Sequence, residues 1–176
     1  KKDINMSDEF SNERIEAEKR PGFLKAISIM SFVGIGLRLI LNFAGLFSTK
    51  RTEEQMLAAK YEMSEIINDF QEAGMDSFVH FMRQSQEITE ITNEHLLLAN
   101  GLAIIIGLIG LLGVIKMWNG FKVGFHIYII YSLFYVGAIY LYVSPVNIPS
   151  IMIIFGSVIS LIFILMYSRN LHWMKK

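Results

Sequence analysis

Four long apolar runs divide this chain of 176 residues. Each run holds about twenty residues or more, which is the length that an α-helix needs to cross a hydrocarbon core of about 30 Å. The pattern predicts an all-α integral membrane protein with four transmembrane helices. We expect the four spans at residues 22–47, 96–115, 123–143 and 148–167.

The segments between the runs differ in charge. Residues 48–95 contain ten acidic and four basic side chains, so their net charge is −6. Lys and Arg next to a span are retained on the cytoplasmic side, and most of them here lie in the polar tail 1–21, the turn 116–122 and the basic tail 168–176. We therefore expect these three segments and both termini in the cytoplasm. Residues 48–95 and a short loop at 144–147 are expected outside.

The chain contains no cysteine. Outer loops of animal four-span proteins are commonly braced by disulfides, so their absence favours the inner membrane of a bacterium. It also excludes thiol chemistry and cysteine zinc sites. No histidine or carboxylate stands at metal-ligand spacing, and we expect neither a metal nor another cofactor. Because the sequence starts at Lys1 rather than Met, we expect residues to precede it.

The acidic segment 48–95 has helical periodicity. The four residues starting at Thr52 match a capping box, Gly74 is a plausible left-handed terminator, and Asp76 or Ser77 can cap a second helix. No Gly or Pro follows before Gly101, so the second helix is expected to continue into the second span. The prediction is an antiparallel extracytoplasmic helical hairpin, reaching about 25–30 Å outward if each arm holds about eighteen residues.

Each arm of this hairpin carries an apolar stripe, which is expected to be buried away from water. The arms can bury each other, or part of the stripes can contact a partner protein, and both alternatives stay open. The candidate contact residues are Met56, Met63, Ile66, Phe70, Phe78 and Phe81.

One charged residue, Arg38, lies past the middle of the first run, where a guanidinium costs at least ~2.5 kcal/mol to insert. None of the four runs contains Asp or Glu. Arg38 either pairs or snorkels structurally, or it recognises an anionic ligand. The tyrosines of the third run recur at heptad spacing as far as Tyr142, which predicts a phenol stripe that packs between helices or lines a polar pathway. The candidate intramembrane polar site is Arg38, Asn42, Asn100, Tyr128, Tyr131 and Tyr135.

Glycines are frequent in the first two runs. Gly107, Gly110 and Gly113 recur in the second run, and Gly34 and Gly36 lie in the first. Small residues let helix backbones approach closely in a membrane, so we expect tight helix contacts at all five positions.

Three short segments carry a resemblance to known proteins. They are Arg20-Pro21-x-Phe23-Leu24, then Met117-Trp118-Asn119-Gly120-Phe121-Lys122-Val123-Gly124-Phe125 with Tyr128, and Tyr167-Ser168-Arg169-Asn170-Leu171-x-x-Met174-Lys175. This pattern resembles a family of small uncharacterised bacterial four-span inner-membrane proteins, in which a basic Met-Trp turn is followed by Gly-Phe-x-x-Tyr. The resemblance implies a bacterial origin and the topology above. It implies no activity and no active residues.

Several function classes lack their signature. The chain has no nucleophile with a base, no phosphate-binding loop, no intramembrane carboxylate for proton or sodium coupling, and no basic face for nucleic acid. We expect no enzyme. The favoured hypothesis is an accessory or scaffold subunit of a bacterial membrane complex, whose hairpin contacts an envelope protein or a second copy. The alternative is a protein that binds or transports a small anion or a lipid headgroup through Arg38. Membrane lipids are expected partners in both cases.

Overall fold

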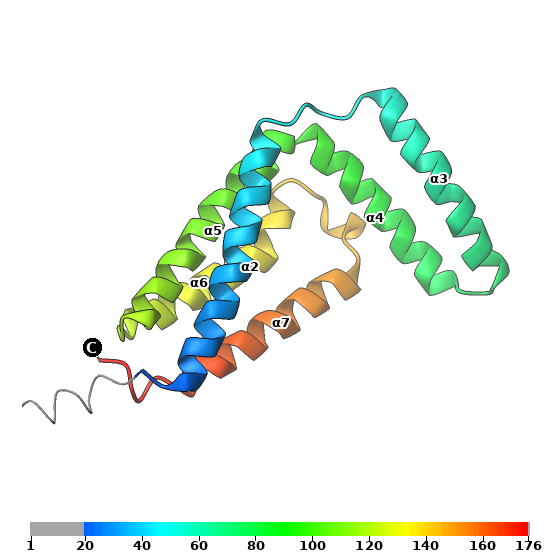
Figure 1. Cartoon of the computed structure of the whole chain (residues 1–176). Coiled ribbons are helices and arrows are strands. Elements are labelled where there is room, and N and C mark those ends of the chain that lie inside the picture. Colours follow the sequence, from blue (N-terminus) through cyan, green and yellow to red (C-terminus); the bar gives the residue numbers. More distant parts are fainter. Residues whose placement is uncertain (1–19, 176) are drawn as a thin grey trace, which may run out of the picture.

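The computed structural model describes residues 20–175 of the chain. This part is helical and contains no named β-strand (Figure 1). Four helices are long and apolar enough to cross a membrane, as the sequence predicts: α2 (Gly22–Leu46), α5 (Leu96–Trp118), α6 (Val123–Gly137) with the 3₁₀ turn η1 (Ala138–Leu141), and α7 (Ser150–Ser168). The other elements are α3 (Glu53–Glu72), α4 (Asp76–Glu94) and the 3₁₀ turn η2 (Pro145–Asn147). Most of the predicted tail 1–21 and the last residue of the tail 168–176 lie outside the described residues.

The ends of the membrane-length helices differ from the predicted spans by a few residues. The third span is α-helical only to Gly137 and continues as the tighter turn η1. The fourth helix starts at Ser150 instead of residue 148, because Pro149 takes the N-cap position. Proline has no backbone N–H to donate and is therefore tolerated where a helix begins.

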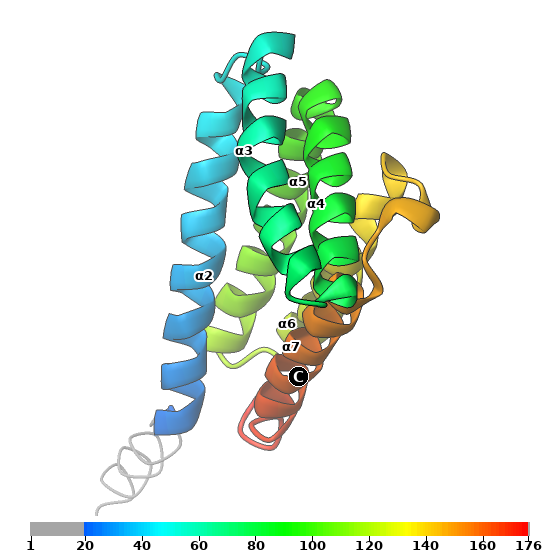
Figure 2. The same ribbon diagram turned by 90° about the vertical axis from the view of Figure 1, so that its right-hand side faces the viewer.

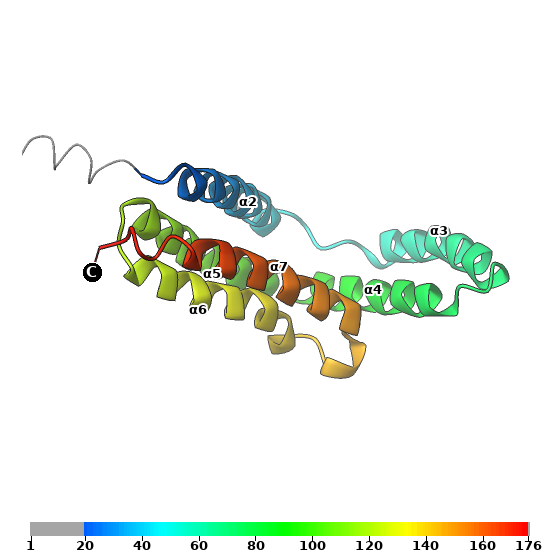
Figure 3. The same cartoon turned by 90° about the horizontal axis from the view of Figure 1, so that it is seen from below.

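Helix α5 packs against both α2 and α6. It lies between them in Figure 3. The closest approach lies at Gly124 of α6, where a Cβ atom would be 2.5 Å from the backbone nitrogen of Met117 and 2.6 Å from the carbonyl oxygen of Gly113. The predicted close contacts are therefore confirmed for α5. They are wrong for Gly34 and Gly36 of α2, where a Cβ atom would meet nothing within 4 Å.

One end of the four-helix unit is closed by three chain segments, residues 20–24, 117–122 and 167–175. The backbone N–H of Lys122 donates to the carbonyl of Lys175 over 3.1 Å, and the guanidinium of Arg20 lies 3.8 Å from the ring centroid of Trp118. Tyr167 and Met174 are buried in the core at this end. These are the segments that carry the resemblance described above, and we call this end of the molecule the closed end.

The opposite end carries the α3–α4 hairpin, and we call it the hairpin end (Figures 1 and 2). The capping box at Thr52 is present in both directions, and Gly74 adopts the left-handed conformation with φ of 72°. The predicted cap of α4 at Asp76 or Ser77 is wrong, because the helix already starts at Asp76 and Met75 holds the N-cap position without a side-chain bond. Between the arms, Lys60 forms an ion pair with Glu90 over 2.8 Å.

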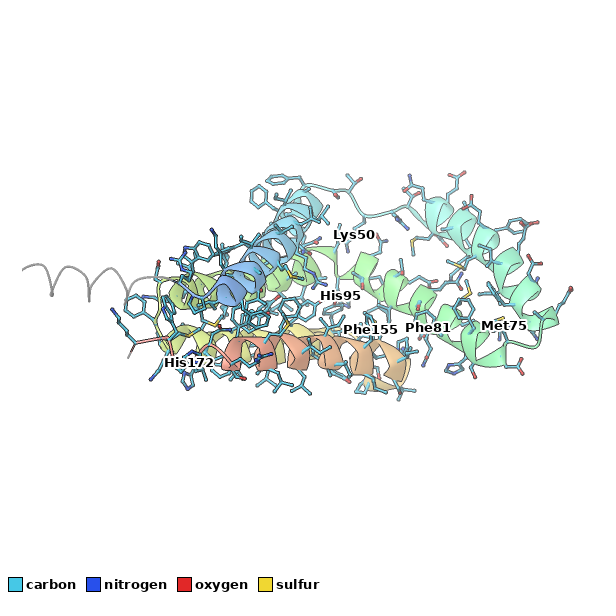
Figure 4. The ribbon with its side chains drawn as sticks, turned by 60° about the horizontal axis from the view of Figure 1, so that its bottom comes forward. Lys50, Met75, Phe81, His95, Phe155 and His172 are labelled. Atoms are coloured by element: carbon cyan, nitrogen blue, oxygen red, sulfur yellow. The ribbon has the colours of Figure 1, made fainter. Side chains whose placement is uncertain are left out.

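The chain changes direction at His95, between α4 and α5 (Figure 1; His95 is labelled in Figure 4). His95 has φ of −102° and ψ of 29°, so α4 does not continue into α5 as expected. Two contacts hold α4 against η2: Asn147 Nδ2 donates to Glu87 Oε1 over 2.6 Å, and Gln84 Nε2 donates to the carbonyl of Val146 over 3.3 Å. The hairpin therefore leans across its end of the bundle instead of extending along the axis of α5.

Candidate functional site

A cavity of about 520 Å³ lies between α2, α5, α6 and α7. Its shape follows from how α2 and α7 are arranged. At the closed end the two helices are joined, because the Tyr167 hydroxyl donates to Ser31 Oγ over 2.9 Å. Toward the hairpin end they diverge (Figure 1). The polar residues on its wall are Ser31, Arg38, Asn42, Tyr131, Tyr135, Tyr142 and Ser160.

Arg38 supplies the positive charge of this cavity. Its guanidinium carbon lies 4.2 Å from the centroid of the Tyr135 ring, which is the geometry of a cation–π contact. The four membrane-length helices contain no Asp or Glu, and Arg38 makes no ion pair within residues 20–175. An aromatic face lowers the cost of burying a guanidinium but neutralises no charge. The Arg38 charge therefore faces the cavity uncompensated.

Three of the other predicted site residues, Asn42, Tyr131 and Tyr135, also line the cavity near Arg38. Asn42 Nδ2 donates to the carbonyl oxygen of Arg38 over 2.7 Å, one helical turn away, so its amide group bonds backbone and not the guanidinium. The Tyr131 and Tyr135 rings lie 6.0 Å apart along the same face of α6. Asn42 and the tyrosines thus place polar groups on the same wall as the charge.

Two of the six candidates for the polar site lie elsewhere. Asn100 Nδ2 donates to the carbonyl of Leu96 over 3.0 Å, and its side chain fills the space beside Gly45. Tyr128 belongs to the core at the closed end, where its ring lies 4.8 Å from that of Tyr167. The heptad spacing correctly placed the tyrosines on one face, but this face runs from the closed core at Tyr128 into the cavity.

Other cavity residues were not among the predicted site residues. Tyr142 shares the heptad spacing of the third run, so the sequence contained a signal for it. Ser160 and Gly156 come from α7, whose apolar sequence gives no sign of which face meets the other helices. Gly34 borders the cavity as well, which explains why a Cβ atom there would meet open space.

The hairpin candidates pack partly on one another. Near the tip, the Phe78 ring lies 4.6 Å from that of Phe70 and 6.1 Å from that of Phe81. Ile67 and Val79 are the buried residues of the two arms. Met56 and Met63 are half-buried, whereas Ile66 remains exposed. The arms therefore cover part of each other's stripe. The residues left open are chiefly Leu57 and Tyr61, which are 59% and 70% exposed.

The described residues 20–175 contain no cluster of three or more His, Cys, Asp or Glu that could hold a metal ion. Comparisons with protein-family models, with curated proteins and with solved structures gave no match. The function is therefore inferred from the cavity and from the distribution of charge along the molecule.

Proposed function

We propose that this protein binds an anionic group, a lipid headgroup or a small anion, at Arg38 in the cavity between α2 and α7. The observation that carries the proposal is the uncompensated guanidinium on a cavity wall inside a unit of four membrane-length helices. A charged side chain at such a depth costs at least ~2.5 kcal/mol and is usually matched by a partner. No side chain of residues 20–175 supplies a negative charge there.

The guanidinium suits an anionic ligand because it presents several donors in a planar fork that matches phosphate and carboxylate oxygens. The Tyr135 ring holds one face of this group, which leaves the edges of the fork for the ligand. A hydrogen bond to a charged group contributes about 1.5–3 kcal/mol, so one such pair corresponds to roughly 10- to 150-fold in affinity. This is enough to select an anion over a neutral group.

The test replaces Arg38 by Gln and measures binding of phosphatidylglycerol to the delipidated protein by native mass spectrometry. We expect the apparent affinity to fall by about 10- to 100-fold because the charge-assisted bonds are lost. Arg51→Gln is the matched control, since Arg51 is an exposed arginine whose backbone, and not its side chain, bonds Asn93. Equal binding by Arg38→Gln and wild type would end the proposal.

The orientation of the protein in its membrane is part of the proposal. The closed end gathers the basic residues Arg20, Lys116, Lys122, Arg169 and Lys175, while the net acidic hairpin lies at the other end. Because Lys and Arg are retained in the cytoplasm, this supports a cytoplasmic closed end and an external hairpin. The absence of cysteine supports a bacterial inner membrane as the location.

A second candidate function, an accessory or scaffold subunit, is favoured by one observation on the hairpin. Leu57 and Tyr61 stand one helical turn apart on α3 and remain mostly exposed although α4 covers other parts of the stripe. A photo-crosslinking residue at Tyr61 tests this function in cells. A defined intermolecular product with an envelope protein or a second copy is expected, and intrachain products alone would count against it.

A further inference from the structure

The wall of the cavity on the α7 side is apolar and uncovered. Met152, Phe155 and Ile159 border the cavity and are 48%, 66% and 41% exposed. Exposing such a surface to water is unfavourable, because each Å² of apolar area left in water costs about 25 cal/mol. An apolar group therefore covers this wall when the protein is in its membrane.

The volume of the cavity limits what this group can be. A helix with side chains is about 10–12 Å wide and rises 5.4 Å per turn, so one turn occupies roughly 400–600 Å³. The cavity of about 520 Å³ thus holds the volume of about one turn, so a membrane-spanning helix of a partner could enter it only in part. Its size falls within the range of about 300–1,000 Å³ that is usual for small-molecule pockets.

The route into the cavity is lateral. At the closed end the buried side chains of Leu24, Met117, Tyr167 and Met174 fill the space between the helices. Toward the hairpin end α2 and α7 diverge, and the hairpin lies on the side of the bundle where they do so (Figures 1 and 2). In a bilayer this gap opens into the lipid leaflet beneath the hairpin, so a lipid can reach Arg38 without passing through water.

The position of Arg38 fits a headgroup with its chain pointing deeper. Arg38 precedes the end of α2 at Leu46 by eight residues, which is about 12 Å along the axis. The cavity continues toward the closed end past Gly34 as far as Ser31. Gly34 borders this deeper part, where the lack of a side chain leaves room for a methylene chain. Gly156 of α7 borders the cavity near the level of Arg38, because a Cβ atom there would lie 3.8 Å from Val136 Cγ2, one residue beyond Tyr135.

We infer that the anionic ligand is a lipid that enters between α2 and α7, with its headgroup at Arg38 and an acyl chain in the space beside Gly34. This inference deepens the binding function proposed above and rests on it. It excludes a free small anion as the preferred ligand, because such an anion leaves the apolar wall uncovered.

The test fills the space for the chain while leaving Arg38 intact. Gly34→Leu places a side chain in the open cavity, since a Cβ atom there meets nothing within 4 Å. Gly36→Leu is the matched control: it lies on the same helix, its Cβ atom also meets nothing within 4 Å, and it does not border the cavity. Gly156→Leu narrows the same cavity from α7, next to Val136, and is the second variant if Gly34→Leu fails to fold.

The measurements are titrations of delipidated protein with phosphatidylglycerol, phosphatidylcholine and glycerol 3-phosphate, which lacks acyl chains. We expect Gly34→Leu to weaken phosphatidylglycerol binding by about tenfold or more and Gly36→Leu to change it by less than about twofold. Glycerol 3-phosphate is expected to bind at least about a hundredfold more weakly than phosphatidylglycerol. Phosphatidylcholine should bind more weakly too, because its headgroup has no net negative charge.

Two results would overturn the inference and leave the binding of an anion at Arg38 standing. One is unchanged phosphatidylglycerol binding by a folded Gly34→Leu or Gly156→Leu protein. The other is glycerol 3-phosphate binding as tight as that of the lipid. The binding of an anion at Arg38 is contradicted by a different result, unchanged binding by Arg38→Gln. The experiments therefore distinguish a failure of that proposal from a failure of the lipid inference. A dimer that excludes lipid from the wild-type protein would contradict the inference as well.

Discussion

The chemistry of the candidate site depends on two side chains from different helices, Arg38 of α2 and Tyr135 of α6. Their contact of 4.2 Å requires only the face of an aromatic ring. The phenol hydroxyl is not part of this contact. The two parts of Tyr135, ring and hydroxyl, can therefore be separated by substitution.

We expect Tyr135→Phe to retain lipid binding within about twofold and Tyr135→Leu to weaken it by about three- to tenfold. Phe keeps the ring face, whereas Leu removes the cation–π contribution of about 0.5–1 kcal/mol or more that positions the guanidinium. The measurement is the phosphatidylglycerol titration described above. Equal loss in the two variants would show that the hydroxyl, and not the ring, acts on the ligand.

The Arg38 site also shows how far residue types predict a site. The cost of an intramembrane arginine singled out Arg38 without any structure. Helical spacing placed Asn42 near it, because both residues lie on α2. The same kind of spacing put the tyrosines on one face of α6, but only the packing of the helices brings Tyr135 to Arg38. Asn100 of α5 does not reach Arg38, because spacing within one helix carries no information about how it is rotated against another.

The backbones of α5 and α6 approach each other closely. Their backbones meet at Gly113 and Gly124, where any side chain on α6 would strike the backbone of α5. Backbone atoms cannot move aside as the end of a flexible side chain can, so this contact holds the two helices in one register. The glycines of α5 predicted the approach, since small residues are the usual means of close packing in membranes.

We expect Gly124→Ala to destabilise the protein by about 1–3 kcal/mol, in spite of the higher helix propensity of Ala, because the added Cβ would lie 2.5 Å from the Met117 nitrogen. Gly137→Ala serves as the control. A Cβ atom there meets nothing within 4 Å, and the change should be neutral or stabilising by up to about 1 kcal/mol. Thermal unfolding in detergent compares the two. A Gly124→Ala protein as stable as wild type would contradict this packing.

In the hairpin, sequence signals between neighbouring residues predicted the local structure, but they did not predict how the hairpin is oriented. Its first helix begins at the predicted capping box, and its turn at Gly74 uses the predicted left-handed glycine. These are interactions between residues close in the chain. The break at His95 was not predicted, because the contacts of α4 with Val146 and Asn147 join segments about sixty residues apart.

The whole molecule separates two kinds of charge. Basic residues surround the closed end, and the net acidic hairpin occupies the other end. The absence of cysteine from these 176 residues makes this arrangement easy to test, since a single cysteine that is introduced is the sole thiol among them.

We expect Ser64→Cys on the hairpin to react with a membrane-impermeant maleimide in intact cells, because Ser64 is exposed on the external side of the proposed topology. Asn119→Cys, exposed in the turn at the closed end, should react only after the membrane is permeabilised. Reaction of both positions, or of Asn119→Cys alone, in intact cells would contradict the proposed orientation.

The sequence by itself determined the helical class, the four membrane-length helices and the capped hairpin. Each of these depends on hydrophobic length, charge or local hydrogen bonding, which are properties of neighbouring residues. Only the tertiary structure decided that α2 and α7 join at the closed end and diverge to form the cavity beside Arg38. That outcome depends on which faces of the apolar helices pack together. A helix such as α7 is apolar on all sides, so no periodicity in its sequence marks the face that packs against the others. The four apolar runs thus predicted the class of the protein, and their packing located the candidate site.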